Sequence, residues 1–257
     1  ALRASSDPRI PSELHGFKLA GNPAAIVPAM PEFNRARDRN LNEPELKAYV
    51  EGVQALDPGP TRDTLMLALY LGGQRLTMLG RVAPADVDLH SGTIRLYDKK
   101  GKRQKPRVHR LPLTNRAQAI VKRRLELAAA AQNPYVFAGP RKVPVRVETL
   151  SNAVCEIARE MVKAGTAREH FQMRDVRRTC ETIMRRKPLS IPKEICSQIQ
   201  SHGLGGVQQR HYDMNEYLDE KREALKAWDK RLRAIEKGQF TRSATVVPIK
   251  RARRKAA

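Results

Sequence analysis

The sequence predicts an α+β domain that is mainly helical and contains one small antiparallel β-sheet. Apolar residues recur at helical spacing through most of the chain after residue 42. Between residues 86 and 113 they instead alternate with polar residues or are β-branched, as in strands. With 257 residues, 40% of them hydrophobic, the chain can bury the core of one large domain.

The first two predicted helices follow each other and end at a pair of glycines. In "NEPELKAYVEGVQAL", Asn42 is a candidate N-cap and Pro44 lies in the first turn. "PTRDTLMLALYLGG" predicts a more buried helix, which Gly72 and Gly73 end. The apolar stripe of the first helix consists of Leu46, Tyr49, Val50 and Val53.

The predicted sheet is built from "DVDL", "TIRLYD" and "RVHRLPL". Ser91 and Gly92 lie in the first connection, and "KKGKRQKP" forms the second. Further helices are expected at about 115–131, 147–164, 173–186, 192–200 and 206–236, the last of them broken.

Composition divides the chain into three parts. Residues 1–36 are rich in Pro, Ala and Gly and read as a connector with little core of its own. Residues 37–238 carry the organised periodicity and form the main domain. Residues 239–257 include "TRSATVVPIKRARRKAA", which has six basic and no acidic residues and is expected to be a disordered tail.

The charge of the chain indicates a polyanionic partner. Lys and Arg total 49 against 27 Asp and Glu, a formal net charge of +22. Such an excess destabilises a compact fold by self-repulsion unless a polyanion is bound, and nucleic acid is the first candidate. The longest apolar run, "LMLALYL", is too short to span a membrane, and few aromatic residues are present to anchor the chain at a membrane surface.

The cysteines indicate a reducing compartment, so the cytoplasm is the expected location. Cys155, Cys180 and Cys196 are odd in number and widely spaced. Neither a disulfide framework nor a metal site has this spacing, so three buried free thiols are expected.

The segment "KKGKRQKPRVHR" holds seven basic residues among twelve and no acidic one. A solvated hairpin tip is one interpretation. The other is a β-ribbon whose cations contact DNA phosphates, with one lysine able to protonate a leaving oxygen. The residues expected to bind DNA here are Lys100, Lys102, Arg103 and Lys105.

The helix "MRDVRRTCETIMRR" places Arg177 on the same face as its apolar residues. An arginine on a core-facing stripe is costly unless it meets an anion. Arg177 therefore either pairs with a buried carboxylate or binds a phosphate, which suits its planar set of donors. Arg174 and Arg178 lie at the edge of this face or away from it.

Three further residues each allow two interpretations. Arg75 follows the glycine pair and either caps the preceding helix or extends into a cleft. His202 ends a predicted helix and is either structural or a donor to a phosphate oxygen. Tyr212, beside His211 in "RHYD", taken alone reads as a packing aromatic or as a nucleophile.

Taken together, these segments resemble the catalytic domain of tyrosine recombinases, most closely the phage-type integrases. "GGQRLTML" resembles the first arginine box. "YDKKGKR" resembles the hairpin with the catalytic lysine, for which Lys99 is the best match and Lys100 and Lys102 are the alternatives. "RDVRRT" resembles the His-x-x-Arg box, "QSHG" the box with the second histidine, and "RHYD" the nucleophile box. The five motifs occur in the family's order.

The resemblance implies a site-specific recombinase that breaks and rejoins double-stranded DNA through a 3′-phosphotyrosine. It implies Tyr212 as nucleophile, Lys99 as general acid, and no metal or other cofactor. It also implies self-association on DNA, in a tetrameric synapse, and it makes residues 1–36 the end of a truncated core-binding domain. The residues expected to surround the phosphate are Arg75, Arg174, Arg177 and His202; Arg178 is expected to contact DNA.

The sequence departs from the family pattern at two positions. Arg174 stands where the His-x-x-Arg box has histidine, so this group donates to phosphate but cannot accept a proton. Met78 stands where the family has an acidic residue three positions after the first arginine. Two alternatives therefore stay open: a type IB topoisomerase-like enzyme, and a non-catalytic DNA-binding protein with a degenerate recombinase fold.

Overall fold

The computed structural model describes residues 39–99, 106–139, 141–202 and 216–241. The chain divides between residues 38 and 39, and the description concerns the second unit. The predicted linker and nearly all of the predicted tail lie outside the described residues, so the three-part division stays a prediction. The predicted site residues outside the described ranges are Tyr212, Lys100, Lys102, Arg103 and Lys105.

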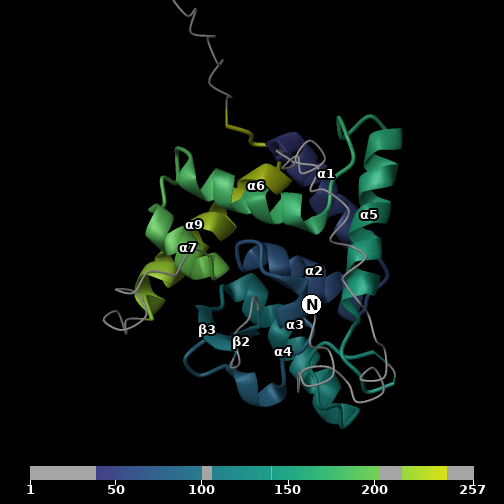
Figure 1. Cartoon of the computed structure of the whole chain (residues 1–257), viewed down its shortest axis with the longest axis vertical. Helices are drawn as coiled ribbons and strands as arrows, with labels where there is room; N and C mark the ends of the chain where they lie inside the picture. Colours follow the sequence, from purple (N-terminus) through teal and green to yellow (C-terminus); the bar gives the residue numbers. More distant parts are fainter. Residues whose placement is uncertain (1–38, 100–105, 140, 203–215, 242–257) are drawn as a thin grey trace, which may run out of the picture. The chain divides into compact units, whose positions relative to one another are not determined.

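The described residues form a mainly helical α+β domain with a small antiparallel sheet, which confirms the predicted fold class (Figure 1). The helices and strands, in chain order, are α1 (Glu43–Gln54), α2 (Pro60–Tyr70), α3 (Leu76–Leu79), a 3₁₀ turn (Pro84–Asp86), β1 (Val87–Asp88), β2 (Thr93–Asp98), β3 (Arg107–Pro112), α4 (Asn115–Ala130), α5 (Val147–Lys163), α6 (Met173–Arg185), α7 (Lys193–Gln200) and α9 (Leu218–Glu236).

Helix α1 begins where the sequence predicts, because its first turn is capped from both sides. The Asn42 side chain accepts a hydrogen bond from the Glu45 backbone N–H at 2.8 Å, and the Glu45 carboxylate accepts one from the Asn42 N–H at 2.8 Å. This reciprocal arrangement satisfies two donors that the helix start would otherwise leave unpaired. The predicted apolar stripe of α1 is buried throughout.

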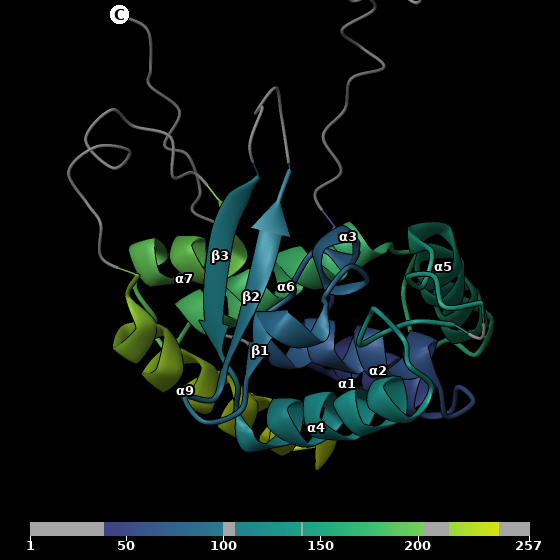
Figure 2. The ribbon, with the colours of Figure 1, turned by 90° about the horizontal axis from the view of Figure 1, so that it is seen from below.

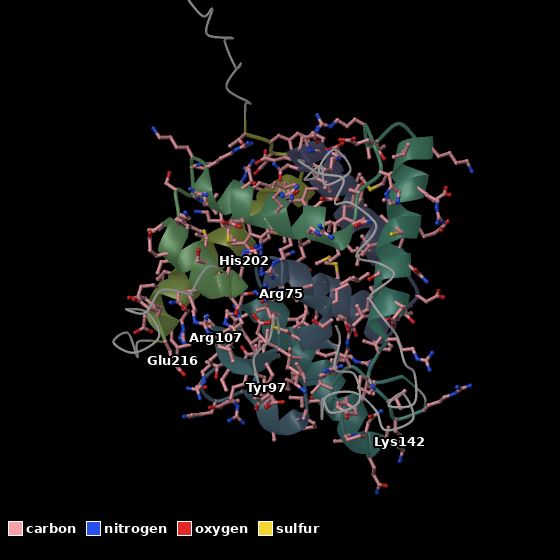
Figure 3. All side chains as sticks on the ribbon, viewed as in Figure 1. Arg75, Tyr97, Arg107, Lys142, His202 and Glu216 are labelled. Carbon is pink, nitrogen blue, oxygen red and sulfur yellow. The ribbon has the colours of Figure 1, made fainter. Side chains whose placement is uncertain are left out.

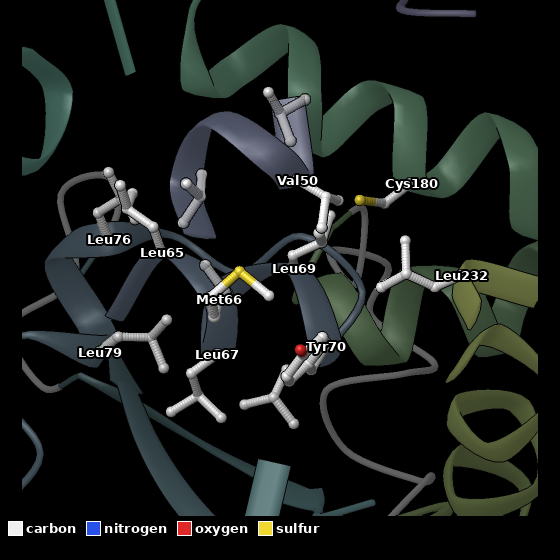
Figure 4. Packing of buried hydrophobic residues seen from close by; sticks show 14 of the residues in the cluster. Val50, Leu65, Met66, Leu67, Leu69, Tyr70, Leu76, Leu79, Cys180 and Leu232 are labelled. Atoms are coloured by element: carbon white, nitrogen blue, oxygen red, sulfur yellow. The ribbon is translucent and has the colours of Figure 1, made fainter. Parts of the chain in front are cut away.

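Helix α2 forms the centre of the core. Its residues 63–70 are all buried, and it contacts α1, α3, α4, α5 and α9. Figure 4 shows side chains from other helices around it, among them Val50 of α1, Cys180 of α6 and Leu232 of α9. A helix that is apolar on all sides must be covered on all sides, which explains why α2 is central.

The sheet has the order β1-β2-β3, and both pairings are antiparallel. Figure 2 shows β2 and β3 side by side. On β2, Ile94, Leu96 and Asp98 are all buried, as expected for residues that alternate onto one face. In the β2–β3 register, Leu96 lies opposite His109, and Asp98 lies opposite Arg107.

Helix α9 packs on its own domain. It contacts β3, α1, α7 and α2, and it buries Leu225, Trp228, Leu232 and Ile235. The Trp228 indole N–H donates to the Leu69 carbonyl in the last turn of α2 at 2.8 Å. The apolar face of this helix is thus used within the chain.

The cysteines differ in one respect from expectation. Cys180 and Cys196 are buried and Cys155 is half-buried, and all three are free thiols. Cys155 lies on the rim of the apolar stripe of α5, where a small side chain stays partly exposed.

Within the described part of the chain, no helix combines the length and apolar character needed to cross a membrane.

Candidate active site

The turn after α2 brings three helices together. Gly72 and Gly73 have φ of +75° and +85°, a region that L side chains rarely adopt. A Cβ at Gly73 would lie 2.9 Å from the Arg177 Cα, and one at Gly72 would lie 3.0 Å from a methyl carbon of Ile199. The glycine pair therefore ends α2 and also lets α6 and α7 approach this turn closely.

Arg75 lies just beyond this turn, at the N-terminal cap of α3. Its side chain is 19% exposed, and its Nη1 donates to Asp98 Oδ2 at 2.7 Å. Arg75 thus points to the end of β2 and does not cap α2 as a surface side chain. In Figure 3, Arg75 and His202 lie in the same region of the molecule.

Asp98 connects this arginine to the end of α7. The Ser201 hydroxyl donates to the same carboxylate oxygen, Asp98 Oδ2, at 2.9 Å. Ser201 ends α7 in the left-handed conformation, with φ of +53°, and His202 follows it directly. Lys99 follows Asp98 in the same way and is exposed. Asp98 and Ser201, each the chain neighbour of a candidate catalytic residue, are therefore bound to each other, and Asp98 also binds Arg75.

Arg177 lies nearby on α6, where it is buried among backbone carbonyls. Its Nη1 donates to the Gly73 carbonyl at 2.7 Å, and its Nη2 donates to the Gln200 carbonyl. Burial and then the charge of Arg75 lower the pKa of the Arg177 guanidinium to about 10, so it remains charged at neutral pH. Asp98 and Glu181 act on this pKa in the opposite direction.

Glutamine side chains fasten the end of α7 to the glycine turn. Gln200 Nε2 donates to the Gly72 carbonyl at 2.7 Å and to the Arg177 carbonyl at 3.0 Å. Gln74 Nε2 donates to the Ile199 carbonyl at 2.8 Å. The bonds to Gly72 and Ile199 supply donors to carbonyls near the C-terminal ends of α2 and α7, and all three bonds fix α7 beside the segment that carries Arg75.

His202 is at the open side of this cluster. Its ring is 39% exposed, and its Nδ1 lies 3.8 Å from Glu181 Oε2. Its backbone N–H donates to the Ser197 carbonyl at 2.9 Å, which holds the residue against the end of α7. The imidazole is thus partly accessible from solvent while its backbone is fixed.

The other two arginines of α6 are placed differently. Arg174 is exposed in the first turn of the helix, where the backbone N–H groups favour an anion rather than a cation. Arg178 is half-buried; its Nη1 donates to the Arg39 carbonyl at 3.1 Å and lies 3.7 Å from Asp175 Oδ1. The structure therefore gives Arg178 intramolecular contacts, and its predicted contact with DNA stays a prediction.

Sequence reasoning did not single out Asp98, Ser201 or Gln200. A signal for Asp98 was present, because it continues the inward positions of Ile94 and Leu96 in "TIRLYD". A carboxylate on the buried face of a strand requires a cationic or hydrogen-bonding partner. Ser201 and Gln200 have no comparable local signal, since their partners are distant in sequence.

The hydrogen bonds bring four of the five predicted motifs together. The segments that carry Arg75, Lys99, Arg177 and His202 all meet around the Gly72–Gly73 turn, Asp98 and the end of α7. Two guanidinium groups close together, with an exposed lysine and a partly exposed histidine on adjoining segments, have the chemistry needed to bind a strongly anionic group.

A mainly helical domain with a small antiparallel sheet is the fold of tyrosine recombinase catalytic domains. The family model described as "Phage integrase family" matches residues 39–194, more than half of the chain. The chain therefore belongs to the phage integrase family of tyrosine recombinases. The matched segment contains Arg75, Lys99 and Arg177 and ends before His202 and Tyr212.

Solved structures share the fold at low sequence identity. The crystal structure of XerA recombinase is 21% identical, with a TM-score of 0.50 over 77% of this chain and 66% of that chain. The integrase from mycobacterium phage Brujita is 18% identical, with a TM-score of 0.53 over 84% of this chain and 68% of that chain. This chain thus spans slightly less than two thirds of the XerA chain. A search of curated proteins gave no match.

Proposed function

We propose that the protein is a site-specific DNA recombinase, an integrase that cleaves and rejoins double-stranded DNA of phage or other mobile elements in the cytoplasm. The observation that carries the proposal is the hydrogen-bonded convergence of the segments bearing Arg75, Lys99, Arg177 and His202. Membership of the phage integrase family and a net charge of +22 support the same function.

In the proposed reaction, the Tyr212 oxygen attacks the phosphorus of a DNA phosphodiester. A new bond forms between this oxygen and phosphorus, and the bond from phosphorus to the 5′ oxygen breaks. Lys99 donates a proton to the departing 5′ oxygen. The product is a 3′-phosphotyrosine and a free 5′-hydroxyl, and attack by a 5′-hydroxyl of another strand reverses the step without ATP.

The arginines supply the electrostatic part of catalysis. Negative charge on the non-bridging oxygens grows as the pentavalent phosphorus forms, and donors already held in place stabilise it without reorganisation. Arg177 suits this role because backbone carbonyls fix its guanidinium, and its buried Nε has no hydrogen-bond partner among the described residues. Arg75 approaches from the α3 side, and His202 donates from the end of α7.

Arg174 changes which groups at this site can accept a proton. An arginine in place of histidine adds a fixed positive charge at the start of α6, where the helix also favours an anion. It cannot accept the proton of the tyrosine hydroxyl. In the proposed mechanism this proton leaves to water, and Arg174 contributes charge alone.

Covalent capture on DNA tests the proposal. The protein, expressed from its complete native gene, is incubated with nicked duplexes that contain a randomised core, and covalent adducts are isolated under denaturing conditions and sequenced. We expect wild type to trap a defined sequence through its 3′ phosphate, and we expect Tyr212→Phe to trap none. Tyr217→Phe is the matched control and should trap the same sequence as wild type.

Three outcomes would contradict the proposal. An adduct of equal yield with Tyr212→Phe would exclude this nucleophile. Tight DNA binding without an adduct on any sequence would favour the non-catalytic DNA-binding protein, an alternative that the Arg174 and Met78 departures keep open. Adducts on all sequences, together with relaxation of supercoiled DNA and no strand exchange, would favour a type IB topoisomerase-like enzyme.

A further inference from the structure

We propose that Asp98 is the residue that positions Arg75 for catalysis, a role that rests on the recombinase function proposed above. The Asp98 side chain is 4% exposed, and one of its oxygens accepts from both Arg75 and Ser201. The structure thus assigns the orientation of the first catalytic arginine to a carboxylate at the end of β2.

The position of Asp98 makes it a junction between three segments of the site. Through Arg75 it binds the turn between α2 and α3, and through Ser201 it binds the end of α7, which carries His202. Its own C-terminal neighbour is Lys99. A shift of this single carboxylate would therefore alter the relative placement of the proposed phosphate donors Arg75 and His202.

Charge explains why an acid is needed at this point. Arg75 and Arg177 are close enough for the charge of Arg75 to lower the pKa of Arg177, and Asp98 opposes that effect. Two buried or half-buried cations repel each other strongly in a medium of low dielectric constant. A carboxylate bonded to one of them reduces this repulsion in the absence of DNA and keeps the arginine in a defined rotamer.

Met78 cannot supply this carboxylate. It is buried in the apolar core, 4% exposed, three residues after Arg75. Asp98 lies 23 positions after Arg75 in the chain. Its carboxylate therefore reaches the arginine from the sheet and not from the helix that Arg75 caps. The arginine therefore has an acidic partner although residue 78 is apolar.

A purely structural salt bridge is the competing explanation, and the substrate can distinguish the two. If Asp98 acts through Arg75, its loss should matter only while the scissile phosphate carries the charge that Arg75 neutralises. A methylphosphonate at the scissile position replaces a charged oxygen with methyl. A bridging sulfur at the 5′ position instead makes a leaving group that needs no proton, so it reports on the general acid.

The experiment measures the rate of covalent adduct formation by the full-length protein on the captured sequence, with the three kinds of scissile group. We expect Asp98→Asn to lower the rate on ordinary phosphate roughly 100-fold. On methylphosphonate, the rate of Asp98→Asn should return to near the wild-type rate, and the rate of Arg75→Ala should do the same. Bridging sulfur should rescue Lys99→Ala and leave the Asp98→Asn defect in place.

Two further variants control for folding. Asp86→Asn removes another buried carboxylate, which accepts from the Tyr97 hydroxyl away from the site, and should leave the rate on phosphate unchanged. Ser201→Ala removes one donor to Asp98 and keeps the ion pair, so a smaller loss with the same rescue by methylphosphonate is expected even if Asp98→Asn folds poorly.

The outcomes separate this inference from the proposed function. Absence of an adduct with wild type would overturn both. An adduct with wild type and an equal rate with Asp98→Asn would overturn the positioning role alone. An Asp98→Asn defect that is the same on all three substrates, with no methylphosphonate rescue in Ser201→Ala, would assign Asp98 to general structure and would also overturn it.

Discussion

His109 is a buried histidine that holds the end of α7 from the sheet side. Its Nε2 lies 2.8 Å from the Ile199 carbonyl, and because a carbonyl only accepts, the ring donates from this nitrogen. Burial, and then the charges of Lys221, Arg107 and Arg177, lower the pKa of His109 to about 3. The imidazole is therefore neutral in the folded protein at every pH near neutrality.

Because of this depressed pKa, His109 should make stability depend on pH. The unfolded chain binds a proton on His109 below about pH 6.5 and the folded chain does not, so the free energy of unfolding falls as pH falls. Between pH 7 and pH 5 we expect wild type to lose about 2 kcal/mol more than His109→Gln, which keeps an N–H donor but does not titrate. Urea unfolding of both proteins at the two pH values measures the difference.

Equal pH dependence in wild type and His109→Gln would mean that the histidine becomes protonated in the folded state. The same substitution at the exposed His90, His90→Gln, is the matched control for the loss of an imidazole.

At the scale of elements, Trp228 is one of the buried residues that attach α9 to the core. The indole is fully buried, and its N–H donates to the Leu69 carbonyl just before the glycine turn. Arg116 of α4 strengthens the attachment, because its Nε donates to Asp229 at 2.7 Å and its guanidinium lies 4.2 Å from the Tyr70 ring centroid. Helix α9 therefore supports the turn that leads to Arg75.

Replacing Trp228 should lower stability. Trp228→Phe removes the indole N–H and leaves a small cavity, so we expect the free energy of unfolding to fall by about 2 kcal/mol. Trp228 is the single tryptophan of the sequence, so the variant has no tryptophan fluorescence with which to follow unfolding. Circular dichroism in urea is therefore the appropriate measurement for both proteins. Phe240→Leu, at a 41% exposed position, should change the value by less than about 0.5 kcal/mol. Similar small effects for both variants would contradict the attachment.

At the scale of the whole molecule, the charge of +22 predicts binding to DNA that weakens with salt. Each phosphate neutralised contributes about 0.9 to the slope of log affinity against log salt. Replacing the four predicted hairpin contacts, Lys100, Lys102, Arg103 and Lys105, with Gln should therefore reduce the slope by about 3 to 4. Fluorescence anisotropy with a labelled duplex over a range of salt concentrations measures it.

A matched set of four lysines tests whether the effect is local. These lysines lie on α1, α4, α5 and α9 and are exposed or partly exposed: Lys47, Lys122, Lys163 and Lys226. Their replacement with Gln changes the formal net charge by the same amount and should leave the slope nearly unchanged. An equal reduction by both sets would assign the salt dependence to total charge and would contradict specific phosphate contacts by the hairpin.

Much of this architecture could be predicted from the sequence because it depends on local rules. Asn42 and Glu45 cap α1 through neighbours in the chain, and Gly72 and Gly73 end α2 by their own backbone freedom. The alternation in β2 likewise reports its buried face. Each of these signals depends on residues within a few positions of one another, so periodicity and turn chemistry are sufficient to detect it.

The partners of the site residues could not be predicted in the same way. The burial of Arg177 followed from its place on an apolar stripe, and the alternatives were a carboxylate or a phosphate; in the structure its terminal nitrogens donate to backbone carbonyls. Which backbone carbonyls lie near a buried side chain depends on how α6, α7 and the glycine turn pack together. No local pattern carries that information.

By itself, the sequence determined the fold class, the order of the elements, the family and the five motifs, because periodicity, capping and motif spacing are local properties of the chain. The tertiary structure alone decided that Asp98 joins Arg75 to Ser201, that backbone carbonyls surround Arg177, and that α9 packs on its own domain. The physical reason is that a buried charge requires partners, and packing brings those partners from segments that are distant in sequence.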